Sequence, residues 1–348
     1  MSSQPRTVGD AGEFAVVEAV TSRLSQGTHV TVGPGDDAAV LSVPGGEVVA
    51  SLDMLVQNRH FRLDWSSAAD VGHKAAAENL SDINAMGGRA TALLVGLGSP
   101  AELASSWALE FADGLAAEAA EVGASVIGGD LTQADVITIA VTVLGTCEQG
   151  VVRRSGARVG DVVALAGRQG WAAAGFAVLG RGFRSPRAVV DAHRRPHPPY
   201  DAGPQAAALG ATAMIDVSDG LLQDLGHIAA ASRVSIDVRS QALEVAEPLV
   251  AVGSALGVDP LTFVLSGGDD YSLAATFPAG TALPHEWREI GVVTSPGAES
   301  GSGDRQEPVV GQRAADAEPE AEAGTVPRYV VTVDGLEPEQ PAGHQHFR

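Results

Sequence analysis

The sequence is poor in residue types that several classes of protein depend on. It has one cysteine, Cys147, one lysine, Lys74, and only 4% aromatic residues in 348 positions. A single cysteine excludes a domain held together by intramolecular disulfides, and we expect Cys147 to be a small buried residue near a strand end. A lone lysine outside any G-x-x-x-x-G-K-[ST] pattern excludes a P-loop that binds phosphates with its own lysine.

Positive charge is also scarce. The sequence has 22 Lys and Arg but 43 Asp and Glu, so the formal net charge is −21. Such a chain repels a phosphate backbone, so we expect no nucleic-acid partner. No apolar run reaches the length of a spanning helix, and the first residues lack the pattern of a secretion signal. These absences predict a cytoplasmic protein without membrane contact.

What is present is an ordinary folding composition, with 45% hydrophobic and 19% charged residues. Short β-rich runs alternate with Ala- and Leu-rich stretches, which predicts an α/β (α+β) fold. The length favours two domains, and a turn-rich joint at 153–161 places the boundary near residue 150, giving 1–150 and 151–348. The segment 297–328 is rich in Gly, Glu, Ala and Pro, and it predicts a disordered insertion. The strands expected most clearly are 47–53, 136–146, 161–166 and 329–333, and the helices follow Trp65, run over 107–122 and begin at Ser218.

Acidic residues beside glycine recur where predicted strands end or helices begin. Any one of them is most often simple turn chemistry. Several converging carboxylates would repel one another unless cations lay between them, and oxygen donors without His or Cys clusters favour Mg²⁺. Mg²⁺ commonly shares its ligands with nucleotide phosphates, so the pattern predicts phosphoryl transfer. The groups contain Asp36 and Asp37, Asp53, Asp82, Asp130, Asp216 and Asp219, and Asp269 and Asp270.

Some of these positions allow a second interpretation. Lys74, Glu78 and Asp82 lie at i, i+4 and i+8 of one predicted helix, and for Lys74 and Glu78 a surface ladder of ion pairs is favoured. Ser218 or Asp219 could cap the helix that follows them, whereas Asp216 on the strand side could not.

In order along the chain, the motifs resemble those of thiamine-monophosphate kinases. These belong to the superfamily that also contains aminoimidazole ribonucleotide synthetase, selenophosphate synthetase and a hydrogenase maturation factor. The resemblance covers nearly the whole chain. The motifs that carry it are GDDAAVL, SLDMLVQNRHF, KAAAENLSDINAMGG, IGGD, RRSGARVGD, IDVSDGLLQDLGHIA and SGGDDY.

The resemblance implies the family's two-domain fold, in which the N-terminal sheet forms a barrel with that of a second subunit, and hence a homodimer. It implies direct transfer of the γ-phosphoryl group of ATP to thiamine monophosphate with several Mg²⁺ ions and no phosphoenzyme. The implied metal site contains Asp37, Ser51, Leu52 through its backbone, Asp53, Asp82, Asp130, Asp216 and Asp219. The implied ATP contacts are Gly129, Asp130, Arg154 and Ser218, and the implied substrate contacts are His60, Asp269 and His344.

The chain departs from the family pattern at Leu52, at Trp171 and Ala172, at Asp269, which replaces a longer Glu, and at His344, where an aromatic residue often stacks. Two alternatives therefore stay open. One is another ATP-dependent enzyme of the superfamily, of which the synthetase is the hardest to dismiss. The other is a non-catalytic protein that binds nucleotide or thiamine phosphate.

Overall fold

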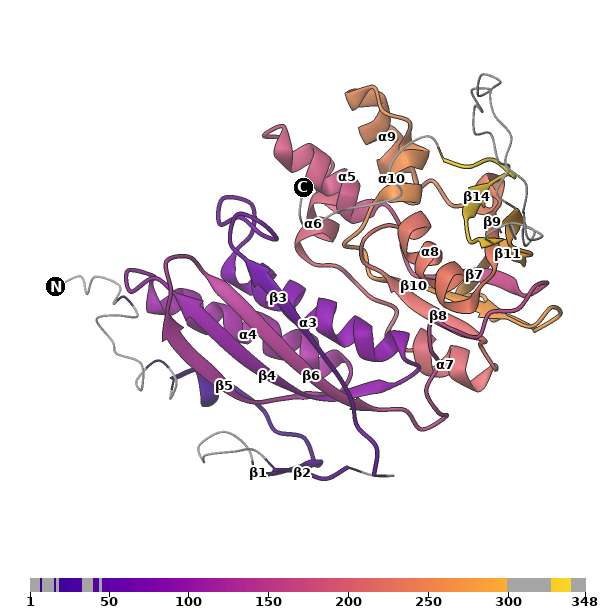
Figure 1. Ribbon diagram of the computed structural model, residues 1–348. Coiled ribbons are helices and arrows are strands. Elements are labelled where there is room, and N and C mark those ends of the chain that lie inside the picture. The colour runs from indigo at the N-terminus through magenta and orange to yellow at the C-terminus, as the bar shows by residue number, and fades with distance from the viewer. Residues whose placement is uncertain are drawn as a thin grey trace, which may run out of the picture.

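Two separate β-sheets organise the chain, one in each half of the sequence (Figure 1). The computed structural model describes residues 7, 16, 19–32, 40–43, 46–298 and 327–338. The first large sheet has the order β3-β6-β4-β5, with antiparallel pairs except for the parallel pair β4 and β5. Its strands are β3 (Val49–Val56), β4 (Arg89–Ser99), β5 (Ser125–Gln133) and β6 (Thr138–Thr146).

Helices α3 (Ala68–Ala85) and α4 (Ser105–Glu121) cover one face of this sheet. Ser67 and Asp70 form the capping box predicted from the sequence, which fixes where α3 begins. The two helices approach closely because glycines lie at their contact. A Cβ at Gly72 would lie 2.0 Å from the carbonyl oxygen of Phe111, so only glycine fits there.

The second large sheet has six strands in the order β14-β9-β11-β7-β10-β8. All neighbouring pairs are antiparallel except β14 with β9. Its strands are β7 (Val162–Ala166), β8 (Ala213–Val217), β9 (Ser235–Val238), β10 (Ser272–Phe277), β11 (Trp287–Thr294) and β14 (Val331–Val333).

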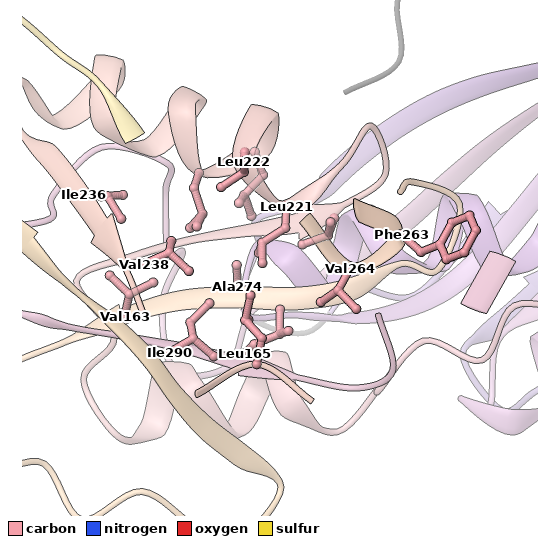
Figure 2. Packing of buried hydrophobic residues seen from close by; sticks show 14 of the residues in the cluster. Val163, Leu165, Leu221, Leu222, Ile236, Val238, Phe263, Val264, Ala274 and Ile290 are labelled. Atoms are coloured by element: carbon pink, nitrogen blue, oxygen red, sulfur yellow. The ribbon is translucent and has the colours of Figure 1, made fainter. Parts of the chain in front are cut away.

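Helices lie on both faces of the second sheet. One face carries the larger core, where Leu165, Ala274 and Ile290 of the strands meet Leu221 and Val264 of the helices (Figure 2). The other face packs against α7 and against Ala85 at the end of α3. The helices are α5 (Trp171–Gly180), α6 (Arg187–Arg194), α7 (Ala202–Ala208), α8 (Leu221–Ser232), α9 (Glu247–Leu256) and α10 (Pro260–Ser266), with a 3₁₀ turn η1 (Ser240–Ala242).

Helix α3 connects the two halves, because it contacts β3 and β6 of the first sheet and β8 of the second. Side chains on this helix can therefore face residues that are more than a hundred positions away in sequence. This makes α3 the element on which a site between the two sheets depends.

The predicted elements near the site are confirmed as helices and strands, with small shifts of their ends. The helix predicted to begin at Ser218 begins instead at Leu221. At the two ends of the predicted insertion, β12 (Gly297–Ala298) pairs with β13 (Pro327–Arg328), and the residues between them lie outside the described part. A further short pair is formed by β1 (Val30–Val32) and β2 (Val40–Leu41).

In the described ranges, no single helix combines the length and the apolar composition that crossing a membrane requires. The bent pair α9 and α10 meets that criterion only when its two helices, at 113° to each other, are taken together.

Candidate functional site

Strand β3 directs alternate side chains to opposite faces of the first sheet. Ser51 and Asp53 belong to the half-buried series on the helix side, whereas Leu52 and Met54 belong to the exposed series. The Leu52 side chain is 54% exposed on the open face. Any contribution of Leu52 to a site beside Ser51 and Asp53 must therefore come from its backbone.

Asp82, on α3, lies against this strand. The Ser51 hydroxyl donates to its carboxyl group, and in its protonated form Asp82 donates to Asp53. Burial, together with the charges of Asp216 and Asp53, raises the pKa of Asp82 to about 8, although the hydrogen bond from Ser51 acts in the opposite direction. Asn79, one turn earlier, accepts a 3.1 Å hydrogen bond from the backbone N–H of Asp53. Helix α3 thus fixes the strand backbone as well as supplying a carboxylate.

Asp216 comes from the second sheet, where it lies on β8 and is only 5% exposed. Ser81 donates a 3.2 Å hydrogen bond to its Oδ2. Burial raises the pKa of Asp216 to about 6, although the Ser81 hydrogen bond and the positive charge of Arg154 act in the opposite direction. Carboxylates with pKa values raised by burial and by one another are typical of functional sites.

Ser51, Asp82 and Asp216 border a cavity of about 420 Å³. Its walls come from β3, the end of α3, residues 153–155 and β8, so both sheets contribute to it. Of the residues predicted for the site, it is lined by Ser51, Asp82, Arg154 and Asp216.

The turn after β8 does not use Ser218 or Asp219 to cap the following helix. Gly220 is the N-cap of α8, and no side chain caps that helix. Instead, the Asp224 carboxylate accepts 3.0 Å hydrogen bonds from the N–H groups of Asp219 and Gly220. Gln223 donates to Asp219 Oδ2 over 3.0 Å. Neither Ser218 nor Asp219 is used as a cap, so the interpretation of these residues as simple helix caps is wrong.

A second turn packs onto the first. Asp269 N–H donates to the carbonyl oxygen of Ser218 over 2.9 Å, and Tyr271 N–H donates to that of Val217 over 3.2 Å. Asp269 and Tyr271 both have positive φ, 65° and 52°, which is an uncommon and strained conformation for residues other than glycine. Gly268 allows the contact, because a Cβ there would lie 2.0 Å from the Ser218 oxygen.

The prediction that Lys74 and Glu78 belong to a ladder of ion pairs on the surface is wrong. Lys74 is 4% exposed, and its Nζ lies 2.7 Å from Asp269 Oδ2. Burial raises the pKa of Glu78 well above its usual value, and the charge of Asp53 raises it further. Both side chains therefore lie inside the protein, close to the charges of Asp53 and Asp269.

Two of the predicted site residues, Gly129 and Asp130, do not line this cavity. Gly129 and Asp130 lie on β5, at the opposite edge of the sheet from β3, and both are exposed. Asp130 pairs with Gly96 and belongs to the open face. His60 lies in the turn after β3, where its Nδ1 accepts a 2.9 Å hydrogen bond from Val56 N–H. Asp37 and His344 lie outside the described residues.

Sequence reasoning missed two acidic residues. The spacing of Glu78 puts it on the same face of α3 as Asp82, but that spacing alone favoured a surface ion pair with Lys74. Asp224 gave a weaker signal, since only the turn geometry shows that it holds the backbone of that turn. Burial raises the pKa of Asp224 to about 7.

Across the described ranges, no three His, Cys, Asp or Glu side chains already form a closed metal centre. Mg²⁺ does not need one, because it usually takes one or two carboxylates, keeps waters and shares substrate phosphates. The Ser51, Asp82 and Asp216 oxygens supply donors of that kind beside an open volume. The arrangement suits a site that is completed by bound phosphates.

Comparisons with known proteins show which family the chain resembles. Residues 35–147 match the model of the AIR synthase related protein, N-terminal domain, and residues 158–301 match that of the C-terminal domain. A thiamine-monophosphate kinase of Mycobacterium tuberculosis is 46% identical over 295 residues, covering 84% of this chain and 88% of that protein. One from Corynebacterium glutamicum is 39% identical over 298 residues, covering 83% and 88%.

Solved structures give the same result. The thiamine-monophosphate kinase of Stenotrophomonas maltophilia superposes with a TM-score of 0.75 at 29% identity, covering 94% of this chain and 98% of the other. AaThiL complexed with AMPPCP and TMP superposes with a TM-score of 0.74 at 28% identity, covering 97% of each.

The two matched family models, together with the two separate sheets, define a two-domain α/β protein of the AIR synthase related type. The extent and identity of the curated relatives narrow this further, and the chain belongs to the thiamine-monophosphate kinase family. The predicted family and fold class are confirmed.

Proposed function

We propose that this chain phosphorylates thiamine monophosphate with ATP and so forms thiamine diphosphate. The observation that carries the proposal is the meeting of Ser51, Asp82 and Asp216 at one cavity, with Arg154 beside them. Relatives that cover most of the chain are kinases of this name. The synthetase and binding-protein alternatives have no comparable support.

Magnesium fits the donors of the cluster, which are all oxygen atoms. When bound, it would neutralise the repulsion between two phosphates and hold them for in-line transfer. The charge of Asp216 raises the pKa of Asp82, and the charge of Asp53 raises the pKa of both, which is the kind of repulsion that a bound cation would relieve. The residues proposed to hold magnesium are Asp37, Ser51, Leu52 through its carbonyl group, Asp53, Asp82, Asp130, Asp216 and Asp219.

The nucleotide is proposed to contact Gly129, Asp130, Arg154 and Ser218. Arg154 is the best supported of these, because it lines the cavity and its charge lowers the pKa of Asp216. A guanidinium group is permanently charged and can bind phosphate oxygens in pairs. Arg154 would therefore orient the nucleotide phosphates toward the acidic cluster.

The acceptor is proposed to contact His60, Asp269 and His344. Asp269 retains 43% side-chain exposure while its backbone is fixed against Ser218. A fixed, half-exposed carboxylate can face a cationic ring or accept a hydrogen bond from an amino group, and thiamine monophosphate offers both.

Transfer is proposed to be direct, with no phosphoenzyme. The acceptor phosphate is largely ionised near neutral pH, so no strong base is required. Cys147 is not a suitable nucleophile, since burial raises the pKa of its thiol. The role left to the side chains is to bind, align and neutralise charge.

The protein is proposed to be a cytoplasmic homodimer that pairs through the open face of the first sheet. Leu52, Met54 and Leu94 expose 54%, 49% and 37% of their surface on that face. An exposed apolar face of this kind marks an interaction surface. Asp130 lies on the same face, and a second subunit would bring this residue against another chain.

The domain boundary is proposed near residue 150. Strand β6 ends at Thr146 and β7 begins at Val162. Likewise, the match to the first family model ends at residue 147 and the match to the second begins at residue 158. The N-terminal unit would supply Ser51, Asp53 and Asp82, and the C-terminal unit would supply Asp216.

The test is incubation of the protein with ATP, Mg²⁺ and thiamine monophosphate, followed by chromatography of the products. We expect thiamine diphosphate and ADP in equal amounts. Tight nucleotide binding without either product would instead support the non-catalytic alternative. Formation of ADP with no phosphorylated thiamine would contradict the assigned acceptor.

A further inference from the structure

Arg154, which is proposed to orient the nucleotide phosphates, lies in the connection between β6 and β7. This connection contains neither helix nor strand. Arg154 is exposed and lines the cavity together with Asp216. Because no secondary structure fixes the Arg154 backbone, the direction of its side chain depends on contacts with other elements.

A single hydroxyl group, that of Ser232, bonds this loop at three places. It donates a 3.1 Å hydrogen bond to the carbonyl oxygen of Arg154. It also accepts 3.1 Å hydrogen bonds from the N–H groups of Gly156 and Ala157. A serine hydroxyl has one hydrogen to donate and two lone pairs that accept, so these three bonds use its full capacity. Removing the hydroxyl takes one partner from three backbone groups at once.

Ser232 belongs to a helix that reaches the cavity. It is the last residue of α8, which ends at the C-cap Arg233 with φ of 60°. Ala231, the preceding residue, lines the same cavity as Arg154. The end of α8 therefore forms part of the cavity wall and also bonds the loop that carries Arg154.

Two other contacts hold the loop against β8. The N–H of Met214 donates a 3.0 Å hydrogen bond to the carbonyl oxygen of Arg153. Gly156 has φ of 140°, and a Cβ there would lie 2.3 Å from the carbonyl oxygen of Thr212. These contacts hold residues before and after Arg154, whereas the serine hydroxyl bonds the carbonyl oxygen of Arg154 itself.

We propose that Ser232 is a positioning residue for the nucleotide: its hydroxyl holds the Arg154 backbone so that the guanidinium group reaches the phosphates of ATP. This inference rests on the proposed function and adds a residue to it. Ser232 does not line the cavity, so its effect is transmitted through the loop. Binding of thiamine monophosphate is not expected to depend on Ser232.

Ser235 provides a matched control, because it is the same residue type in the same half of the chain. It lies on β9, where its hydroxyl donates a 3.5 Å hydrogen bond to the carbonyl oxygen of Arg328 and accepts one of 3.3 Å from Val330 N–H. It also joins distant backbone segments, but it does not bond the loop of Arg154. A general loss of structure would affect Ser232→Ala and Ser235→Ala alike.

The first experiment compares steady-state kinetics of the full chain with Ser232→Ala, Ser232→Thr, Arg154→Met, the double variant Ser232→Ala/Arg154→Met, and Ser235→Ala. Alanine is a strong helix former, so Ser232→Ala keeps α8 intact. We expect it to raise KM for ATP on the order of tenfold, the usual effect of weakening one charged contact. KM for thiamine monophosphate should stay within about twofold. Ser232→Thr keeps the hydroxyl and should resemble the wild type in both constants, as should Ser235→Ala.

The double variant tests whether Ser232 acts through Arg154, because residues that act as one unit are not additive. In the Arg154→Met background, Ser232→Ala should cause no further rise in KM for ATP. The inference is overturned if Ser232→Ala leaves KM for ATP unchanged or raises both constants alike. It is also overturned if Ser232→Thr loses as much as Ser232→Ala, or if the effects of Ser232→Ala and Arg154→Met multiply.

Trypsin reports on the loop directly, because it cleaves after arginine and the loop carries the exposed Arg153 and Arg154. A backbone that opens more often is cut faster. Cleavage at these two sites, mapped by mass spectrometry, should therefore be faster in Ser232→Ala than in Ser235→Ala. Equal cleavage rates would show that the hydroxyl does not hold the loop and would overturn the inference.

Failure of the proposed function would be visible separately. A wild-type protein that forms no thiamine diphosphate refutes the proposed function before any variant is compared. Calorimetric titration with Mg²⁺ and a non-hydrolysable ATP analogue then tests Ser232. Weaker binding to Ser232→Ala than to Ser235→Ala supports its positioning role. Equal binding to the two variants, or no binding by the wild type, contradicts it.

Discussion

Ser81 and Asp216 are 135 positions apart in the sequence, and the Ser81 hydroxyl donates a 3.2 Å hydrogen bond to Asp216 Oδ2. This bond fixes α3 against β8 between the two sheets. Asp82 is the next residue on the helix and faces the same cavity. The carboxylates of the two units therefore meet because one helix is tied to both.

The first prediction concerns Asp216→Asn. An asparagine can still accept the hydrogen bond from Ser81, so the fold should persist, while the negative charge proposed to hold magnesium is lost. We expect turnover to fall on the order of 10³-fold. Asp201→Asn is the control, since Asp201 is exposed and pairs with Arg89 at the surface. Near-normal turnover in Asp216→Asn, with an unchanged circular dichroism spectrum, would refute the assigned role.

A second prediction concerns pH and Asp270. Asp270 Oδ1 accepts a 2.9 Å hydrogen bond from Ala172 N–H, whereas its buried Oδ2 has no partner among the described residues. Burial raises its pKa to about 7 from an ordinary 3.8. The folded state therefore holds a proton that the unfolded state has released, and Asp270 costs stability as pH rises through this window.

Asp270→Asn keeps the bond to Ala172 and removes the ionisation. Between pH 5 and pH 8, its free energy of unfolding should gain on the order of 2 kcal/mol relative to the wild type. Urea denaturation at both pH values measures the difference. A constant difference, or one that shrinks as pH rises, would show that Asp270 does not titrate in this way.

The third prediction tests the contact between the two turns. Gly268→Ala would place a Cβ 2.0 Å from the Ser218 oxygen, so the loop must move away and lose the bond from Asp269 N–H. We expect KM for thiamine monophosphate to rise on the order of tenfold or more. Gly226→Ala is the matched control, because nothing lies within 4 Å of a Cβ there and the position is inside α8. Equal kinetics for both variants would argue against the contact.

The fourth prediction tests the proposed dimer. Met54→Lys puts a charge on the open face of the first sheet, where burying it between subunits is unfavourable. Sedimentation velocity should show a shift from dimer to monomer. Val250→Lys, on an exposed side of α9, should leave the dimer intact. A Met54→Lys protein that sediments like the wild type would exclude this face as the interface.

The features that sequence predicted best are local ones. The start of α3 depends on Ser67 and Asp70, which bond each other three residues apart, so the signal lies in one short segment. The acidic turn after Asp216 is equally recognisable. Asp216 ends a strand, and a glycine and an amphipathic helix follow it in the sequence. Such features need no knowledge of the rest of the chain.

The features that sequence missed depend on tertiary contacts. Lys74 looks like a member of a surface ladder until the distant loop of Asp269 covers it. Asp130 stays a predicted ligand, but strand order, which the sequence does not show, places it at the far edge of the sheet from β3 and on the face proposed to meet a second subunit. Neither partner choice nor strand order can be read from spacing along the chain.

The most direct measurement is electron paramagnetic resonance of Mn²⁺ in place of Mg²⁺, with a non-hydrolysable ATP analogue and thiamine monophosphate present. Wild type, Asp82→Asn and Asp216→Asn would be titrated in parallel, with Asp201→Asn as the control. Tight binding of more than one Mn²⁺ by the wild type, and loss of at least one in each of the Asp82 and Asp216 variants, is the expected result. Identical Mn²⁺ binding by all four proteins would contradict a site in which carboxylates of both sheets hold magnesium between two phosphates.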